Sequence, residues 1–250
     1  MNWLLEPSVS TFGPDIDRLY YIILVITGIV FVLTEGLLIY FLVRYRKRPD
    51  RRAEYIHGST RAEVLWTLGP LVIVLMLGFM SKPVWDRAKD PAHFPEDALE
   101  LTVSARQFEW ESYYPGAGGD PDAQDAFSIL NRVHVPVGEP VILHLEAEDV
   151  IHSFFVPRFR VKQDAIPGRT IPVWFEITEP GEYELGCAEL CGIGHYLMDG
   201  VVVVQSRAEF DAWRAEQHAA ALGGTGAAQL AGSGDLDGAP ADGPVAEGGL

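Results

Sequence analysis

The sequence predicts a two-helix transmembrane hairpin followed by an all-β domain. Two long apolar stretches lie within the first 80 residues, and short β-branched runs separated by Gly, Pro and Asp follow from about residue 99. The charge divides at the same boundary. Residues 1–81 hold eight Lys/Arg and seven Asp/Glu, whereas residues 82–250 hold 11 and 28, a formal net charge of −17. The aromatic content of 11% provides enough bulky side chains for a folded core.

The two apolar stretches have the lengths expected of membrane spans. Residues 19–43 are almost wholly apolar, and at about 1.5 Å per residue they exceed the roughly 30 Å hydrocarbon core. Residues 64–80 are fewer, so we expect one more turn at each end and a helix that tolerates Pro70. The first stretch is too long and too late for a cleaved signal peptide, and we interpret it as a retained anchor.

The charges around the spans predict their orientation. Seven cations lie between residues 44 and 61, whereas residues 1–18 contain one cation and three acids. By the positive-inside rule the connecting loop is cytoplasmic. Both termini and the acidic part then lie outside, in the periplasm or an equivalent compartment.

The exported part begins after a Pro-containing connector, and its sequence pattern predicts an antiparallel sandwich or small barrel. Its strand-like runs include LELTVSARQFEW, PVILHLEA, IPVWFEI, GEYELGC and GVVVV. Ser206 and Glu209 form a capping-box pattern that opens a short helix, whose Phe210 and Trp213 share one face. The composition after residue 220 is too poor in bulky apolar residues to fold. We therefore expect an outer tail (1–18), the hairpin (19–88), a globular domain (89–220) and a disordered acidic tail (221–250).

The residues with the most specific chemistry lie in one loop. The segment reads Cys187-Ala-Glu-Leu-Cys191-Gly-Ile-Gly-His195-Tyr-Leu-Met198, and His152 lies 35 residues before it. Two thiolates, two imidazoles and a thioether form a soft ligand set that selects copper. A single copper needs only one cysteine, whereas two cysteines four residues apart can bridge a pair of copper ions. Sharing one electron between two ions spreads the change in charge, which suits a site for electron transfer.

On these residues the chain resembles subunit II of the haem-copper cytochrome c oxidases over roughly residues 15–215. The resemblance implies a cupredoxin-like Greek-key barrel with a dinuclear copper A centre. It implies that cytochrome c is the electron donor and that subunit I, with other oxidase subunits, is the membrane partner; we expect no nucleic-acid partner. The implied copper ligands are the side chains of His152, Cys187, Cys191, His195 and Met198 and the backbone carbonyl of Glu189.

The resemblance also implies contacts with subunit I. The Glu189 carboxylate corresponds to a ligand of a magnesium or manganese ion shared with that subunit. Arg169, in the segment Lys162-Gln-Asp164-Ala-Ile-Pro-Gly-Arg169, corresponds to a residue near the haem propionates. Glu63, three residues before Trp66, corresponds to a glutamate at the mouth of a proton pathway.

One position departs from the family pattern. The usual aromatic pair at which electrons enter reads Gln-Trp-x-Trp, whereas this chain reads Gln107-Phe108-Glu109-Trp110. We expect Phe108, with Trp110, to receive electrons in place of that pair. No C-x-x-C-H occurs, so no fused cytochrome c domain is expected and the donor must be a separate protein.

Simpler interpretations of these residues remain open at this point. The two cysteines suit a short-loop disulfide, although this leaves His195 and Met198 unexplained. Glu63 suits a solvated carboxylate at a helix start. Glu35 lies inside the first span, so it must face protein or be protonated, and we assign it no catalytic role. Four further histidines lack partners at ligand spacing and are expected to be packed or on the surface: His93, His134, His144 and His218.

Other functions compete with that of an oxidase subunit. A quinol-oxidase version of the subunit lacks the two thiolates, and a nitrous oxide reductase carries a large propeller for which 250 residues leave no space. A copper-delivery protein would have little use for a bridging cysteine pair on a two-helix anchor. The copper A subunit of a nitric oxide reductase is the alternative hardest to exclude.

Overall fold

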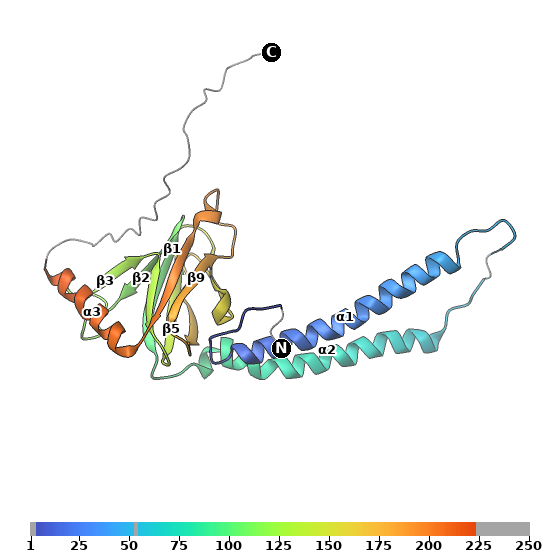
Figure 1. Cartoon of the computed structure of the whole chain (residues 1–250), viewed down its shortest axis with the longest axis horizontal. Coiled ribbons are helices and arrows are strands. Elements are labelled where there is room, and N and C mark those ends of the chain that lie inside the picture. The colour runs from blue at the N-terminus through green and yellow to red at the C-terminus, as the bar shows by residue number, and fades with distance from the viewer. Residues whose placement is uncertain (1–3, 53–54, 224–250) are drawn as a thin grey trace, which may run out of the picture.

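The computed structural model describes residues 4–52 and 55–223, which form an elongated molecule with a helical hairpin at one end and a β-sandwich at the other (Figure 1). The hairpin consists of α1 (Gly13–Arg44) and α2 (Thr60–Lys89). Both are long and apolar enough to cross a membrane, and their apolar windows are not buried by the rest of the described chain. Each contains one of the two predicted spans, and α2 continues through Pro70 and Pro83.

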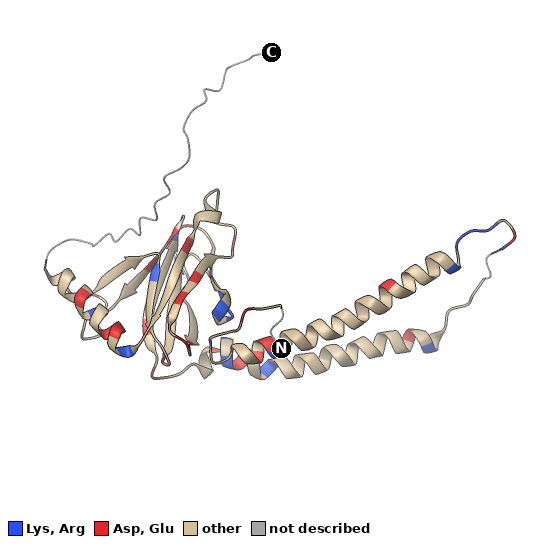
Figure 2. Ribbon diagram, viewed as in Figure 1, with Lys and Arg blue, Asp and Glu red and all other residues tan. Residues whose placement is uncertain are grey.

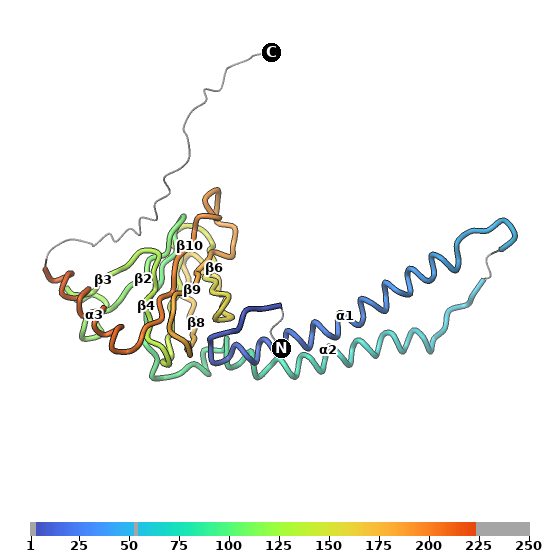
Figure 3. The backbone as a smooth tube through the Cα atoms, viewed as in Figure 1, coloured from blue at the N-terminus to red at the C-terminus, as the bar shows by residue number. Residues whose placement is uncertain are grey.

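Ten strands build the globular domain as two five-stranded sheets. One sheet has the order β3-β2-β1-β5-β8 and the other β4-β10-β9-β6-β7. The strand bounds are β1 Leu99–Arg106, β2 Glu109–Tyr114, β3 Phe127–Leu130, β4 Arg132–Pro136, β5 Pro140–Ala147, β6 His152–Val156, β7 Val161–Ala165, β8 Ile171–Glu176, β9 Gly181–Cys187 and β10 Asp199–Gln205. The tube in Figure 3 shows the chain passing repeatedly between the sheets.

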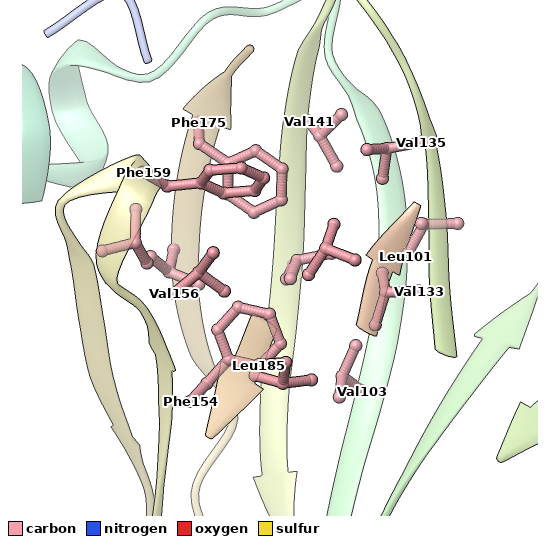
Figure 4. Close-up of a cluster of buried hydrophobic side chains, with 14 of the residues drawn as sticks. Leu101, Val103, Val133, Val135, Val141, Phe154, Val156, Phe159, Phe175 and Leu185 are labelled. Carbon is pink, nitrogen blue, oxygen red and sulfur yellow. The ribbon is translucent and has the colours of Figure 1, made fainter. Parts of the chain in front are cut away.

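The alternation of buried and exposed residues along the strands explains the core. In β1, Leu101, Val103 and Ala105 point inward and are buried, whereas the residues between them face outward or are less buried. Figure 4 shows how side chains from the two sheets interdigitate, with Phe154, Val156 and Leu185 from one sheet and Leu101, Val103 and Val141 from the other. This packing fixes the positions of β6 and β9, the two strands from which the metal-ligand candidates emerge.

Two details differ from the sequence expectation. Antiparallel pairing was predicted throughout, but β1–β5 and β10–β4 are parallel pairs. The reason is that the chain changes sheet between neighbouring strands, so that strands distant in the sequence meet with the same direction. The run 99–110 was expected as one strand, but it forms a hairpin whose turn is Gln107 and Phe108.

A segment before α1 binds the globular domain to the hairpin. Ser10 forms an isolated bridge with Ile177, and the amide of Thr11 donates to the carbonyl of Glu176 at 3.0 Å. Val9 and Phe12, which flank Ser10 and Thr11, are buried. We call residues 8–12 the N-terminal strap. The part predicted as an outer tail thus includes a piece of the domain surface.

Two further contacts hold the domain against the hairpin. Arg160 forms a two-point ion pair with Asp17, at 2.6 and 3.1 Å, and both side chains are nearly buried. The indole of Trp174 in β8 donates to the carbonyl of Arg87 in α2 at 2.7 Å. The domain is therefore attached, through both helices, to the end of the hairpin where α1 begins and α2 ends.

The C-terminal helix α3 (Arg207–Leu222) closes one end of the sandwich. Ser206 and Glu209 form the predicted capping box, Phe210 is fully buried, and Trp213 packs against the domain. Trp213 stacks on His134 with ring centroids 4.0 Å apart. Residues 224–250 of the predicted acidic tail lie outside the described residues.

Candidate metal centre

Strand pairing brings the two ligand segments together. His152 is the first residue of β6, and β6 pairs with β9 so that Phe154 lies opposite Cys187. The loop from β9 to β10 contains the short helix η3 (His195–Leu197) and returns at Met198. The Cys187 amide donates to the Met198 carbonyl at 3.1 Å, which closes the base of the loop. This loop and the start of β6 form one compact site.

Five side chains converge there. The Nδ1 of His152 lies 3.1 Å from the Sδ of Met198 and 4.0 Å from the Sγ of Cys187. The Sγ of Cys191 lies 3.9 Å from that of Cys187, 3.6 Å from the Nδ1 of His195 and 3.8 Å from the Sδ of Met198. Of the described residues, His152, Cys187 and Cys191 form the one group of three or more His, Cys, Asp or Glu close enough to hold a metal ion.

The two cysteines are free thiols in this structure. Their sulfur atoms are 3.9 Å apart, well beyond the roughly 2.05 Å of a disulfide. Because metal–thiolate bonds are about 2.3 Å long, one ion can touch both sulfurs at this separation. The spacing therefore fits a bridging pair better than the disulfide interpretation.

Burial shapes the chemistry of the ligands. His152 is fully buried, and Cys191 and Met198 are nearly so, whereas Cys187 and His195 are half-buried. Burial, together with the neighbouring Cys187, raises the pKa of the Cys191 thiol to about 11. Without metal this thiol stays protonated at neutral pH, so a metal ion that binds must displace its proton. The donor set of two thiols, one thioether and two imidazoles fits soft metal ions such as copper.

Asp149 orients one of the histidines. Its Oδ1 lies 2.8 Å from the Nε2 of His152, and its two oxygens also accept hydrogen bonds from the amides of Val150 and Gln107. Although partial burial opposes its ionisation, these hydrogen bonds, led by that from His152, hold the pKa of the Asp149 carboxyl below its ordinary value. A carboxylate only accepts, so Nε2 carries the proton and Nδ1 presents its lone pair to the sulfurs.

The β1–β2 turn contacts the ligand loop directly. The ring of Phe108 packs against Gly194 so closely that a Cβ there would lie 2.5 Å from its Cδ2 atom, and Gly192 has a φ of +135° beside the same ring. The side chain of Gln107 donates to the carbonyl of Cys191. Glycines at these two positions therefore let an aromatic ring approach the ligand loop.

The two aromatics proposed to receive electrons lie in different surroundings. Phe108 is half-buried at the surface of the loop. Trp110 is buried in the core, edge-on to the rings of His152 and Phe154 at 6.3 and 5.6 Å between centroids. Of this pair, only Phe108 can touch another protein.

Sequence reasoning missed two features of the site. One is the role of Asp149, which a search for a carboxylate three residues before a ligand histidine could have found. The other is a set of exposed apolar side chains on the ligand loop, of which Ile193 is 95% exposed; the set is Leu190, Ile193, Tyr196 and Leu197.

Of the remaining candidates, Glu189 lies within the ligand loop, whereas Arg169 and Glu63 lie away from the ligands. Glu189 is exposed, and its carbonyl lies 3.2 Å from the Sγ of Cys187. Arg169 is exposed in the loop after β7. Glu63 lies in the first turn of α2, at the end of the hairpin that is farther from the β-sandwich and its ligand loop (Figure 1). The four histidines expected to be packed or on the surface have packing or hydrogen-bonding partners: His93 by Asp90, His134 by Trp213, His144 by Glu100 and His218 by Asp125.

Comparison with known proteins agrees with this geometry. Residues 106–206 match the family model described as cytochrome C oxidase subunit II, periplasmic domain, and residues 1–84 match the model of the transmembrane domain of the same subunit. The chain belongs to the cytochrome c oxidase subunit II family. A cytochrome c oxidase subunit 2 of Thermostichus vulcanus is 32% identical over 267 residues, which cover 87% of this chain and 80% of that protein.

Other relatives of this subunit II differ in length. The cytochrome c oxidase subunit 2 of Alkalihalophilus pseudofirmus is 33% identical, and the match covers 80% of this chain but 59% of that protein. The crystal structure of the periplasmic domain of subunit II of cytochrome oxidase from Bradyrhizobium japonicum is 29% identical with a TM-score of 0.44, and it covers 49% of this chain and 95% of that domain.

Proposed function

We propose that this subunit accepts single electrons from cytochrome c and passes them to haem in subunit I, where oxygen is reduced to water and protons are pumped. The convergence of two thiols, two imidazole nitrogens and a thioether in one small site carries the proposal. The oxidase names of the relatives support it over the nitric oxide reductase alternative, which none of the matches reported above favours.

Six residues of the chain would hold a dinuclear copper A centre. The side chains are those of His152, Cys187, Cys191, His195 and Met198, and Glu189 would contribute its carbonyl oxygen. When bound, the copper pair supplies a one-electron acceptor whose change in charge is shared by two ions. The protein buries Met198 and His152 away from water, and the hydrogen bond to Asp149 fixes the His152 ring. Few groups need to move when the charge changes.

The donor is proposed to bind at Phe108, beside an acidic surface. Carboxylates on the outer face of β1, β2 and β5, and directly after β5, outnumber the cations there; they are Glu100, Glu109, Glu111, Glu146 and Glu148. Arg106 is shared among three of them, at 2.6 to 3.4 Å. An acidic surface of this kind attracts a basic cytochrome c over a distance set by the ionic strength.

The contacts with subunit I are proposed on the family resemblance and on exposure. The exposed Glu189 carboxylate is available for a magnesium or manganese ion shared with that subunit, and the exposed Arg169 for the haem propionates. Glu63 is proposed to stand at the mouth of a proton pathway, because it lies in the first turn of α2 next to the basic loop. Both chain termini and the β-sandwich would then lie outside, and the loop between the helices would face the cytoplasm.

Activity of the purified oxidase that contains this subunit tests the proposal. With reduced cytochrome c as donor, we expect oxygen consumption that matches donor oxidation, and two copper ions per copy of this chain in addition to those of subunit I. A complex that consumes nitric oxide but no oxygen with the same donor would establish the nitric oxide reductase alternative instead.

A further inference from the structure

The loop between the two helices concentrates unpaired positive charge. The cations are Arg44, Arg46, Lys47, Arg48, Arg51, Arg52 and Arg61, and the same stretch contains two carboxylates, Asp50 and Glu54. Figure 2 shows the blue segments at this far tip of the hairpin. None of the seven forms an ion pair with any residue in the described ranges, and all are exposed.

The opposite end of the hairpin gives an internal comparison. There, Lys82 pairs with Asp86 at 2.5 Å, Arg87 with Asp15 at 3.5 Å, and Arg160 of the domain with Asp17. Three cations at this end, Lys82, Arg87 and Arg160, therefore have carboxylate partners within the described chain. Those at the loop end have none among the described residues, so anions from outside this part of the chain can serve as their counter-charges.

The loop end is partly ordered by its own contacts. The guanidinium of Arg51 donates to the carbonyl of Arg44, the last residue of α1, at 3.2 Å. The ring of Tyr45 lies beneath the guanidinium groups of Arg44 and Arg51, at 5.5 and 5.3 Å from its centroid. These contacts hold at least two of the cations directly over the end of a membrane-spanning helix.

An apolar groove begins beside these cations. It is open, has a volume of about 410 Å³, and is lined by Thr60, Arg61, Val64, Leu65, Leu68 and Gly69. Thr60 and Arg61 form the polar end of the groove. The other lining residues lie on the same face of α2 and extend the groove toward the middle of the span. From Thr60 to Gly69 the helix rises about 14 Å, close to the roughly 15 Å depth of one leaflet.

The groove also faces away from the proposed partner. Glu63 lies two residues from Arg61 and therefore on the opposite side of α2 from the face that Arg61, Val64 and Leu68 share. If Glu63 faces subunit I, the groove faces lipid. A cationic head above an apolar channel within one leaflet matches the shape and charge of a phospholipid.

We propose that the basic loop and this groove bind an anionic glycerophospholipid, with its phosphate at Arg61 and the loop cations and one acyl chain along Val64, Leu65 and Leu68. The assignment to the cytoplasmic leaflet rests on the orientation given under the proposed function. The access of lipid to the groove rests on the proposed placement of Glu63 toward subunit I, and the attraction itself on the local charge.

Native mass spectrometry of the intact oxidase complex tests this site. The probes are phosphatidylglycerol and phosphatidylcholine with the same acyl chains, and inorganic phosphate as the headgroup alone. We expect phosphatidylglycerol to bind at least fivefold more tightly than phosphatidylcholine. Arg61→Gln should weaken phosphatidylglycerol binding about fivefold, the effect expected of one cation at a headgroup.

Two further variants separate the groove from general electrostatic attraction. Leu68→Trp fills the groove without changing charge and should weaken binding of both lipids, whereas Leu68→Ile keeps the volume and should leave binding unchanged. Lys82→Gln, which removes an exposed cation at the outer end, should also have no effect.

Three results would overturn the proposal. The first is equal affinity for the two lipids, and the second is that the Arg61→Gln and Leu68→Trp variants bind phosphatidylglycerol like the parent protein. The third is displacement of the lipid by an equal concentration of inorganic phosphate. Copper content and cytochrome c oxidation are measured on the same samples. A failure of the proposed electron-transfer function would appear in those two measurements and not in the lipid counts.

Discussion

The Nε2 atom of His152 lies 2.8 Å from the Oδ1 atom of Asp149, while the opposite ring nitrogen faces the sulfurs of the ligand loop. Through the amide of Gln107, the same carboxylate also binds the turn that carries Phe108. One side chain thus links a ligand histidine to the surface where a donor is proposed to bind.

The first prediction concerns this link. Asp149→Ala should weaken copper binding by about 10- to 100-fold, since it removes the group that orients a ligand histidine. Asp149→Asn should keep copper but raise the reduction potential, because the neutral amide stabilises the oxidised, more positive centre less well. Copper titration and potentiometry measure both effects. Glu148→Gln, a neighbouring carboxylate without contact to the ligands, is the control, and equal behaviour of Asp149→Ala and this control would refute the role.

The second prediction concerns the number of coppers. The electron paramagnetic resonance spectrum of the oxidised chain should show one unpaired electron shared by two copper nuclei. Cys187→Ser and Cys191→Ser should each abolish this signal, because a hydroxyl keeps its proton where a thiol loses it to metal. Met198→Leu should retain both coppers and shift the potential, since a thioether is a weak ligand. Hyperfine splitting from a single nucleus at full metal loading would exclude a dinuclear site.

The third prediction concerns salt. Oxidation of a basic cytochrome c should slow steeply as ionic strength rises, since residues 82–250 carry a net charge of −17 and screening acts over about 10 Å at 0.1 M salt. Stopped-flow rates over a salt series measure this. Rates that do not change with salt would indicate a donor held permanently beside the oxidase.

The fourth prediction concerns Phe108. Phe108→Ala should lower the bimolecular rate of electron transfer from cytochrome c and leave copper content and transfer to haem intact, whereas Phe108→Trp should be tolerated. Gly194→Ala should act like Phe108→Ala, because its Cβ would lie 2.5 Å from the Phe108 ring and must displace it. Unchanged rates in both Phe108→Ala and Gly194→Ala would place the site of electron acceptance elsewhere.

Trp110→Ala is not an equivalent test of the same question. Trp110 is 1% exposed, so its truncation should cost about 3–5 kcal/mol of folding free energy. A loss of electron transfer in that variant would report damage to the core.

The fifth prediction concerns the junction with the hairpin. Asp17→Asn leaves the nearly buried guanidinium of Arg160 without its counter-charge and should lower the free energy of unfolding by about 3 kcal/mol or more. Asp15→Asn, which removes an exposed partner of Arg87, should cost about 1 kcal/mol or less. Denaturant unfolding of the full chain in detergent compares them, and equal stability of the two variants would contradict a structural role for the buried pair.

The sequence was sufficient for features that are local. The spans are continuous apolar stretches, and five of the six proposed ligand residues lie within 12 positions. Residue type and spacing suggest Cys187, Cys191, His195 and Met198 as ligands, whereas Glu189 follows only from the family resemblance. The turn at Gln107 and Phe108 was not predicted, because it contains neither Gly nor Pro. The parallel β1–β5 pair and the contact between Asp149 and Gln107 depend on how distant segments meet, which no local pattern encodes.

The N-terminal strap has a consequence for the order in which the protein is made. Ser10 is synthesised near the beginning of the chain, but its partner Ile177 follows 167 residues later. At about 5–20 residues per second, the ribosome needs on the order of 10–30 s to produce that partner. During this interval the two helices are synthesised and the chain crosses the membrane twice, while the N-terminal strap has no partner strand. The sandwich can therefore be completed only after both helices are inserted, and membrane insertion precedes the last step of its folding.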